Sequence, residues 1–95
     1  MKITIELLGL PTLSSVIGKK KEFEIPGGTV EDLIGFLVKR HGPSARKALL
    51  DSDGNLDNSI QIMVNESGFL PRETLADRRL KRGDTVKFLL LAAGG

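Results

Sequence analysis

One amphipathic helix constrains the architecture more than any other segment of the chain. Thr29 is a typical N-cap residue, and Glu31 and Asp32 follow in the first turn, where the helix dipole favours negative charge. The apolar residues then fall at i, i+3, i+4, i+7 and i+8 and form one stripe: Val30, Leu33, Ile34, Leu37 and Val38. Basic residues occupy positions 39–41, and Gly42-Pro43 ends the helix. Because such a stripe must be buried against another layer, this helix is predicted to lie on one face of a sheet.

Four segments with the two-residue period of a strand lie on either side of this helix. They are Ile3 to Leu8, Lys20 to Ile25, Ile60 to Val64 and Thr85 to Leu91. The first two are predicted to form a hairpin across a loop from Gly9 to Gly18, and Phe69-Leu70 is a candidate for a short fifth strand. A second, shorter helix is predicted from Ser44, its expected cap, to Leu50.

This order of elements predicts an α+β domain with a mixed four- to five-stranded sheet and one main helix packed on one face. The first and last strands are expected side by side, parallel and central, which satisfies the handedness rule for crossovers. Period 2 then points one set of side chains at the helix: Ile3, Ile5, Leu7, Val86, Phe88 and Leu90. On the helix-free face we expect a modest apolar patch for a partner, made of Leu8, Met63, Leu89 and Leu91. Burial of the last strand on both faces is the alternative explanation for these leucines.

The final strand runs into a terminal segment without bulky side chains. Ala92, Ala93, Gly94 and Gly95 end the chain, so residues 92–95 are predicted to be a flexible tail on a single domain spanning residues 1–95. Such a tail can enter a narrow cleft of a partner, because glycine has no Cβ and lets another backbone approach closely. The reactive group that it would present is the α-carboxylate of Gly95. Ordinary terminal fraying is the plain alternative.

The composition excludes several classes of function. With no cysteine, the chain has no disulfide, no thiolate metal site and no cysteine nucleophile. No apolar run approaches the roughly 20 residues that span a bilayer, and the chain opens directly on a strand, so we expect no membrane partner and a cytoplasmic location. The segment Asp51-Ser52-Asp53-Gly54 lacks the spacing of an EF-hand loop, and the lone His41 has no second ligand motif, so no metal site is expected.

The chain resembles the small sulfur-carrier proteins of the ubiquitin-like β-grasp superfamily, such as the small subunit of molybdopterin synthase and the sulfur carrier of thiamin biosynthesis. The likeness spans nearly the whole chain. It departs from the former in lacking prolines before the tail, and from the latter in carrying an insertion at residues 44–58. The likeness rests on Ile3 to Leu8, Thr29-Val30-Glu31-Asp32-Leu33, Met63-Val64-Asn65, Leu80 to Val86 and the terminal Ala93-Gly94-Gly95.

The resemblance implies that the chain is a carrier and not an enzyme, with its chemistry at Gly95. An adenylating enzyme of the ubiquitin-activating type would use ATP to convert the Gly95 carboxylate to an acyl-adenylate, and the chain itself would bind no cofactor. A persulfide donor would then replace AMP and leave a thiocarboxylate. The sulfur would pass to an acceptor bound by a partner such as the molybdopterin synthase large subunit. In this cycle Ala92, Ala93 and Gly94 would thread the carboxylate into each partner.

Two further functions remain open at the level of sequence. Some relatives in this superfamily are ubiquitin-like modifiers, joined through the terminal glycine to lysines of other proteins. An RNA-binding β-grasp module is the alternative from another class, suggested by Lys19-Lys20-Lys21 and by the arginine-rich segment 72–82. Such a module needs aromatic stacking platforms, and four Phe with no Tyr or Trp, at a net charge of +2, disfavour nucleic acid as a partner.

Overall fold

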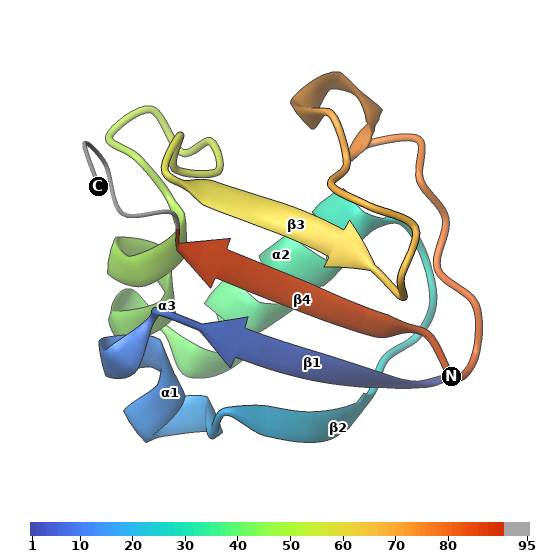
Figure 1. Cartoon of the computed structure of the whole chain (residues 1–95). Helices are drawn as coiled ribbons and strands as arrows, with labels where there is room; N and C mark the ends of the chain where they lie inside the picture. The colour runs from blue at the N-terminus through green and yellow to red at the C-terminus, as the bar shows by residue number, and fades with distance from the viewer. Residues whose placement is uncertain (91–95) are drawn as a thin grey trace.

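The computed structural model describes residues 1–90, apart from the side chains of Thr12 and Val16. Four strands form one sheet, in the order β2-β1-β4-β3. The two central strands pair in parallel and the two edge strands pair antiparallel to them (Figure 1). The strands are β1 (Lys2–Leu8), β2 (Lys20–Glu24), β3 (Ile60–Val64) and β4 (Thr85–Leu90). The predicted α+β class, the hairpin and the central parallel pair are therefore confirmed.

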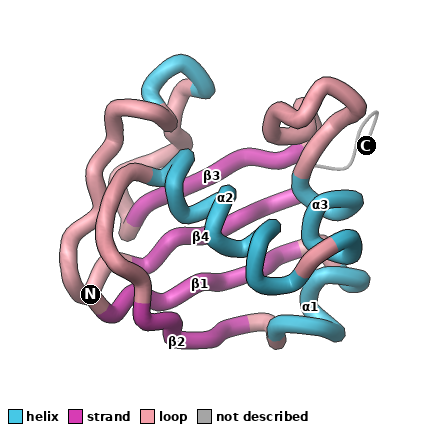
Figure 2. Tube along the Cα trace, turned by 180° about the vertical axis from the view of Figure 1, so that it is seen from behind, coloured by secondary structure: helices cyan, strands magenta, loops and turns pink. Residues whose placement is uncertain are grey.

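The helices pack on one face of this sheet and leave the other face uncovered (Figure 2). Helix α2 (Val30–His41) crosses the sheet, while α1 (Pro11–Ile17) and α3 (Pro43–Leu49) lie together at the end where β1 and β4 finish. A 3₁₀ turn, η1 (Arg72–Thr74), precedes β4. None of the helices within residues 1–90 has the length and apolarity needed to cross a membrane.

The start of α2 is fixed by a capping box between Thr29, the predicted N-cap residue, and Asp32. The Asp32 backbone N–H donates to Thr29 Oγ1 at 3.2 Å, and the Thr29 N–H donates to Asp32 Oδ2 at 2.9 Å. These bonds satisfy two of the amides that a helix start leaves unpaired. The helix buries Val30, Leu33, Ile34 and Leu37 against the sheet, and Val38 lies half-buried at the border of the stripe.

The core lies between α2 and the inward side chains of the strands. Ile3, Ile5 and Leu7 of β1 and Val86 and Phe88 of β4 are buried as predicted. Leu90 was expected to join them, but it remains 40% exposed. The reason is its position at the end of β4, where it borders an open cleft beside α1 and α3 and is not covered by α2.

The predicted loop from Gly9 to Gly18 is wrong, because Pro11–Ile17 form helix α1. Leu10, Leu13 and Ile17 are spaced three and four residues apart, and all three are buried. That spacing is one face of a helix, and Pro11 suits a helix start, where its missing N–H has no partner to lose. The Gly18 N–H closes the helix by donating to Ser14 O at 2.7 Å.

Three smaller predictions also need correction. Helix α3 begins at Pro43, with Gly42 at the cap position and no side-chain cap, so the assignment of Ser44 as its cap is wrong. The segment Phe69-Leu70 contributes only an isolated bridge between Phe69 and Met63, so the fifth strand does not form. Strand β2 ends one residue before the predicted Ile25.

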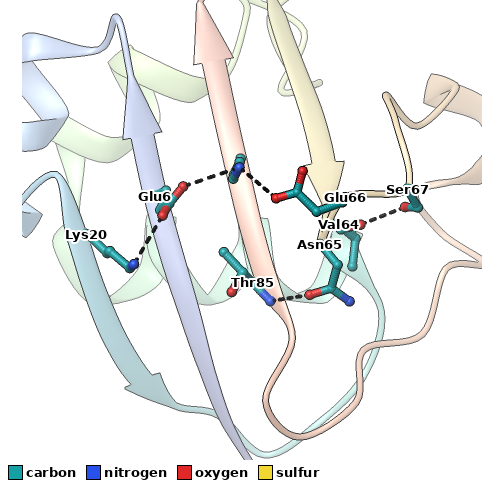
Figure 3. Close-up of polar contacts among 8 residues, drawn as sticks. Glu6, Lys20, Val64, Asn65, Glu66, Ser67 and Thr85 are labelled. Atoms are coloured by element: carbon teal, nitrogen blue, oxygen red, sulfur yellow. Dashed lines mark hydrogen bonds and ion pairs between the residues drawn. The ribbon is translucent and has the colours of Figure 1, made fainter.

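A buried carboxylate joins the turn after β3 to the start of β4. Asp84 is only 9% exposed, and its two oxygens accept the Lys81 N–H at 2.8 Å and Asn65 Nδ2 at 3.0 Å. Asn65, at φ +56°, in turn accepts the Thr85 N–H on its Oδ1 at 2.9 Å (Figure 3). These bonds hold the first residue of β4 beside the end of β3 and so help to set the register of the central strand.

Replacing Asp84 by alanine should lower the free energy of unfolding by about 1–3 kcal/mol, because it leaves the partly buried donors on Lys81 and Asn65 without an acceptor. Urea unfolding followed by circular dichroism measures this change. Asp77→Ala is the control: this side chain is exposed, and its removal should change stability by no more than about 0.5 kcal/mol. Equal effects of the two substitutions would contradict the role given to Asp84.

Gly35 is an unexpected residue for the middle of α2. It is exposed, and nothing lies within 4 Å of the position that a Cβ would take. Glycine in a helix interior is less favourable than alanine by roughly 0.5–1 kcal/mol. Packing within the described chain therefore gives no reason for a glycine at this position.

Gly35→Ala should accordingly raise the free energy of unfolding by about 0.5–1 kcal/mol, since it adds helix propensity without a clash. Gly28→Ala is a matched control of opposite sign: Gly28 has φ +117°, and a Cβ there would lie 2.5 Å from Asp32 Oδ2. Thermal and urea unfolding of both variants measure the two effects. A loss of stability in Gly35→Ala would show that the position is constrained by the monomer itself.

Candidate functional site

The end of β4 is the last part of the chain that the structure describes, and the predicted tail follows it in the sequence. β4 lies between β1 and β3, and its last described residue, Leu90, pairs with Ile60 of β3. The predicted chemical group at Gly95, the threading residues Ala92, Ala93 and Gly94, and the docking residue Leu91 all lie outside the described residues. The structure therefore defines the base of the predicted tail through Leu90 and its neighbours.

A tight contact with β1 shapes this base. Gly9 follows β1 with φ +75°, and a Cβ there would lie 3.2 Å from the Leu90 carbonyl oxygen and 3.3 Å from Leu90 Cβ. Glycine suits both the positive φ and the close approach. The chain can thus leave β1 for α1 directly against the end of β4. Leu8 and Leu90, on either side of this contact, are 48% and 40% exposed.

The helix-free face beside this base carries three of the predicted docking residues. Leu8 of β1 and Leu89 of β4 are paired across the central strands, so their side chains are neighbours on that face. Met63 lies on the same face but pairs with Lys87, which is two residues further than Leu89 from the end of β4. Leu89 and Met63 are half-buried. The structure therefore brings Leu8 and Leu89 together and sets Met63 diagonally behind them.

An ion-pair row crosses the same face next to the apolar pair (Figure 3). Glu6 Oε1 lies 3.5 Å from Lys20 Nζ, and Glu6 Oε2 lies 3.8 Å from Lys87 Nζ. Lys87 Nζ also lies 3.5 Å from Glu66 Oε1. The two outer pairs each have an exposed partner, Lys20 or Glu66, and pairs exposed in this way commonly contribute about 0–1 kcal/mol to stability, whereas Glu6 and Lys87 are both partly buried. Their main consequence is a fixed pattern of alternating charge along one border of the Leu8–Leu89 pair.

Sequence reasoning missed this row and also missed Phe69 as a surface residue. Phe69 forms a bridge with Met63, which places it on the helix-free face, and it is 51% exposed. Its alternation with Leu70 hints at this orientation, but the partner strand cannot be read from so short a segment. The charged row could have been found by aligning Glu6 and Lys87 on the predicted parallel pair.

The remaining candidate groups do not form a second site. Among residues 1–90, no three His, Asp or Glu side chains gather so as to hold a metal ion. His41 packs edge-on against Phe23, with ring centroids 5.9 Å apart, and burial together with the charges of Arg40 and Lys21 lowers its pKa. Arg72 donates to the carbonyls of Leu56, Asp57 and Ile60 at 2.7–3.0 Å, so it stabilises the fold and is not available as a surface cation.

No protein-family model matches the chain, and no curated protein does so either. Several solved structures match over almost their full length. SAMP1 (small archaeal modifier protein 1) from Haloferax volcanii has a TM-score of 0.77 at 22% identity, with 100% of both chains covered. The putative molybdopterin converting factor, subunit 1, from Pyrococcus furiosus has a TM-score of 0.67 at 24% identity, covering 97% of this chain and 99% of that one.

A chain of the Amycolatopsis orientalis BexX/CysO complex has a TM-score of 0.70 at 26% identity, covering 98% of this chain and 99% of that one. The chain therefore has the ubiquitin-like β-grasp fold.

Proposed function

We propose that this protein is a sulfur carrier that acts through the carboxylate of Gly95. An activating enzyme transfers AMP from ATP to that carboxylate and releases pyrophosphate, and the outer sulfur of a persulfide then displaces AMP to form an acyl disulfide. A second thiol of the sulfur donor attacks the donor's own sulfur in this acyl disulfide, so that the donor is left as a disulfide and the chain as a thiocarboxylate. An acceptor enzyme takes the sulfur from the thiocarboxylate during cofactor biosynthesis, with molybdopterin as the first candidate product. Because the activating step consumes ATP, we place the cycle in the cytoplasm.

The observation that carries this proposal is the position of β4. If successive enzymes bind the tail, the segment that precedes it must stay folded during binding. β4 meets this requirement, because it is bonded to a strand on each side and buries Val86 and Phe88 completely. The segment Leu91-Ala92-Ala93-Gly94-Gly95 continues directly from it. The chemistry of the cycle also agrees with a chain without cysteine, which has no thiol of its own to attack the activated end.

The helix-free face fits the role of the docking surface for both partners. The exposed Leu8 and the half-buried Leu89 lie beside the base of the tail, so a partner that covers them also receives the tail. The adjoining row of Lys20, Glu6, Lys87 and Glu66 has alternating charges, which favour a partner with the complementary order. We propose an adenylating enzyme of the ubiquitin-activating type and a sulfur-acceptor enzyme as the two partners.

A protein modifier is the second candidate, favoured by the match to SAMP1. Both functions begin with the same adenylate and differ in the nucleophile that follows, which is a persulfide sulfur for the carrier and a lysine amine for the modifier. The matches to the molybdopterin converting factor and to the BexX/CysO complex support the carrier. Nucleic acid binding finds little support, because Lys20 is paired with Glu6 and Phe69 is the one aromatic side chain on the described helix-free face.

Removing Gly95 should abolish adenylation, because the carboxylate of a chain shortened by one residue no longer reaches the nucleotide. ATP–pyrophosphate exchange by the activating enzyme from the same genome measures this step. Ala92→Gly, which keeps the length and the terminal Gly-Gly, is the control and should remain active. The melting temperature of both variants should equal that of the parent. A truncated chain with unchanged exchange activity would contradict the proposal.

Leu8→Asp should weaken binding to the activating enzyme about tenfold, since it puts a charge in the apolar contact beside the tail, and such losses are typical of central interface residues. Isothermal titration calorimetry measures the affinity. Phe69→Asp is the matched control, because Phe69 is equally exposed on the same face but lies farther from the end of β4. Equal losses in the two variants, or none in Leu8→Asp, would argue against docking at the tail base.

A further inference from the structure

A second surface lies on the helix side of the molecule, away from the proposed docking face. A groove of about 800 Å³ runs between α2, α3 and the loop that follows α3. Its apolar lining includes Ile34, Val38, Leu50 and Leu56. Gly35 also lines it, at the position where the helix backbone is left uncovered by a side chain. Another helix could therefore approach α2 closely at this point, since the distance between packed helices depends on the side chains at the contact.

The charges along this face of α2 are symmetric about Gly35. Glu31 lies four residues before the glycine and Lys39 four residues after it, so all three lie along one face of the helix. Both charged residues line the groove, and among the described residues neither forms a salt bridge. Eight residues of helix separate them by about 12 Å, too far for them to pair within one chain.

We propose that this face is a self-association surface, on which the α2 helices of two copies cross antiparallel at Gly35. In an antiparallel pair centred on Gly35, Glu31 of each copy lies opposite Lys39 of the other. A two-fold axis makes both contacts at once, as an isologous interface requires. The absent side chain at position 35 lets the two backbones come together. The helix-propensity cost of this glycine, which packing within the monomer does not explain, then has a structural reason.

Self-complementarity is the reason to choose a second copy as the occupant. A two-fold contact between identical helices explains why opposite charges lie at equal distances on either side of Gly35. Binding of an unrelated partner would not require this equal spacing. The contact involves only one helix face and part of the α3 region, so we expect it to bury less than the roughly 1,200 Å² that is usual for stable complexes. The dimer is therefore weak and reversible. It leaves the opposite face of the sheet open, so a dimer can still present both tails.

Analytical ultracentrifugation of the full chain at rising concentration tests the proposal. At low salt, the average mass should rise from 10.3 kDa toward that of a dimer, and added salt should weaken the association. Glu31→Lys alone and Lys39→Glu alone should each weaken it at least tenfold, because each brings like charges together. The double variant Glu31→Lys/Lys39→Glu should restore it. An equimolar mixture of the two single variants should form a heterodimer, since every contact across its interface is again between opposite charges.

Two further variants separate this contact from other causes. Glu22→Lys makes the same change in net charge as Glu31→Lys, but on β2, and should leave the association unchanged. If it weakens the association as much as Glu31→Lys does, the weakening is due to general charge repulsion and the proposal is overturned. Gly35→Gln should keep the helix folded, as seen by circular dichroism, yet weaken the association by filling the crossing point. A parent chain that stays monomeric at millimolar concentration, or a mixture of single variants that fails to associate while both remain folded, would also overturn it.

Discussion

The parallel pairing of β1 with β4 is the contact on which the rest of this structure depends. It places these two strands in the middle of the sheet, where Ile5, Leu7, Val86 and Phe88 form the centre of the core. It also fixes which side chains face away from the helices, because a shift of one residue would exchange the two faces. The same register sets Leu8 beside Leu89 at the end of the sheet. Fold and candidate site therefore follow from one strand pairing.

The elements with a long, regular pattern could be predicted from the sequence. The stripe and caps of α2, the alternation of β1 and β4 and their central position all follow from local periodicity and from the handedness of crossovers. Helix α1 could not be recognised as easily, because seven residues between Gly9 and Gly18 give two turns of pattern and begin with proline. The network of Asn65, Asp84 and Thr85 joins segments about twenty residues apart, and no local pattern marks such a contact.

The candidate site was predictable in part. Alternation within β1, β3 and β4 put Leu8, Met63 and Leu89 on the helix-free face, but it could not show that Met63 lies two residues further than the other two from the end of β4. The Glu6–Lys87 pair could have been found on the predicted parallel strands, but its extension to Lys20 also needs the register of β2. On the other side of the molecule, the structure shows that one groove beside α2 is lined by Glu31, Gly35 and Lys39, which the sequence alone did not connect. The two proposed contact faces thus lie on opposite sides of one sheet.

The central functional claim is that another enzyme charges the carboxylate of Gly95 and that this carboxylate then carries sulfur. The most direct test is the intact mass of the protein purified from its own cells under conditions that preserve thioacids. The carrier account predicts a species heavier by the exchange of one oxygen for sulfur, located at the C-terminus by fragmentation. A chain found only with an unmodified carboxylate, or joined through Gly95 to a lysine of another protein, would contradict it.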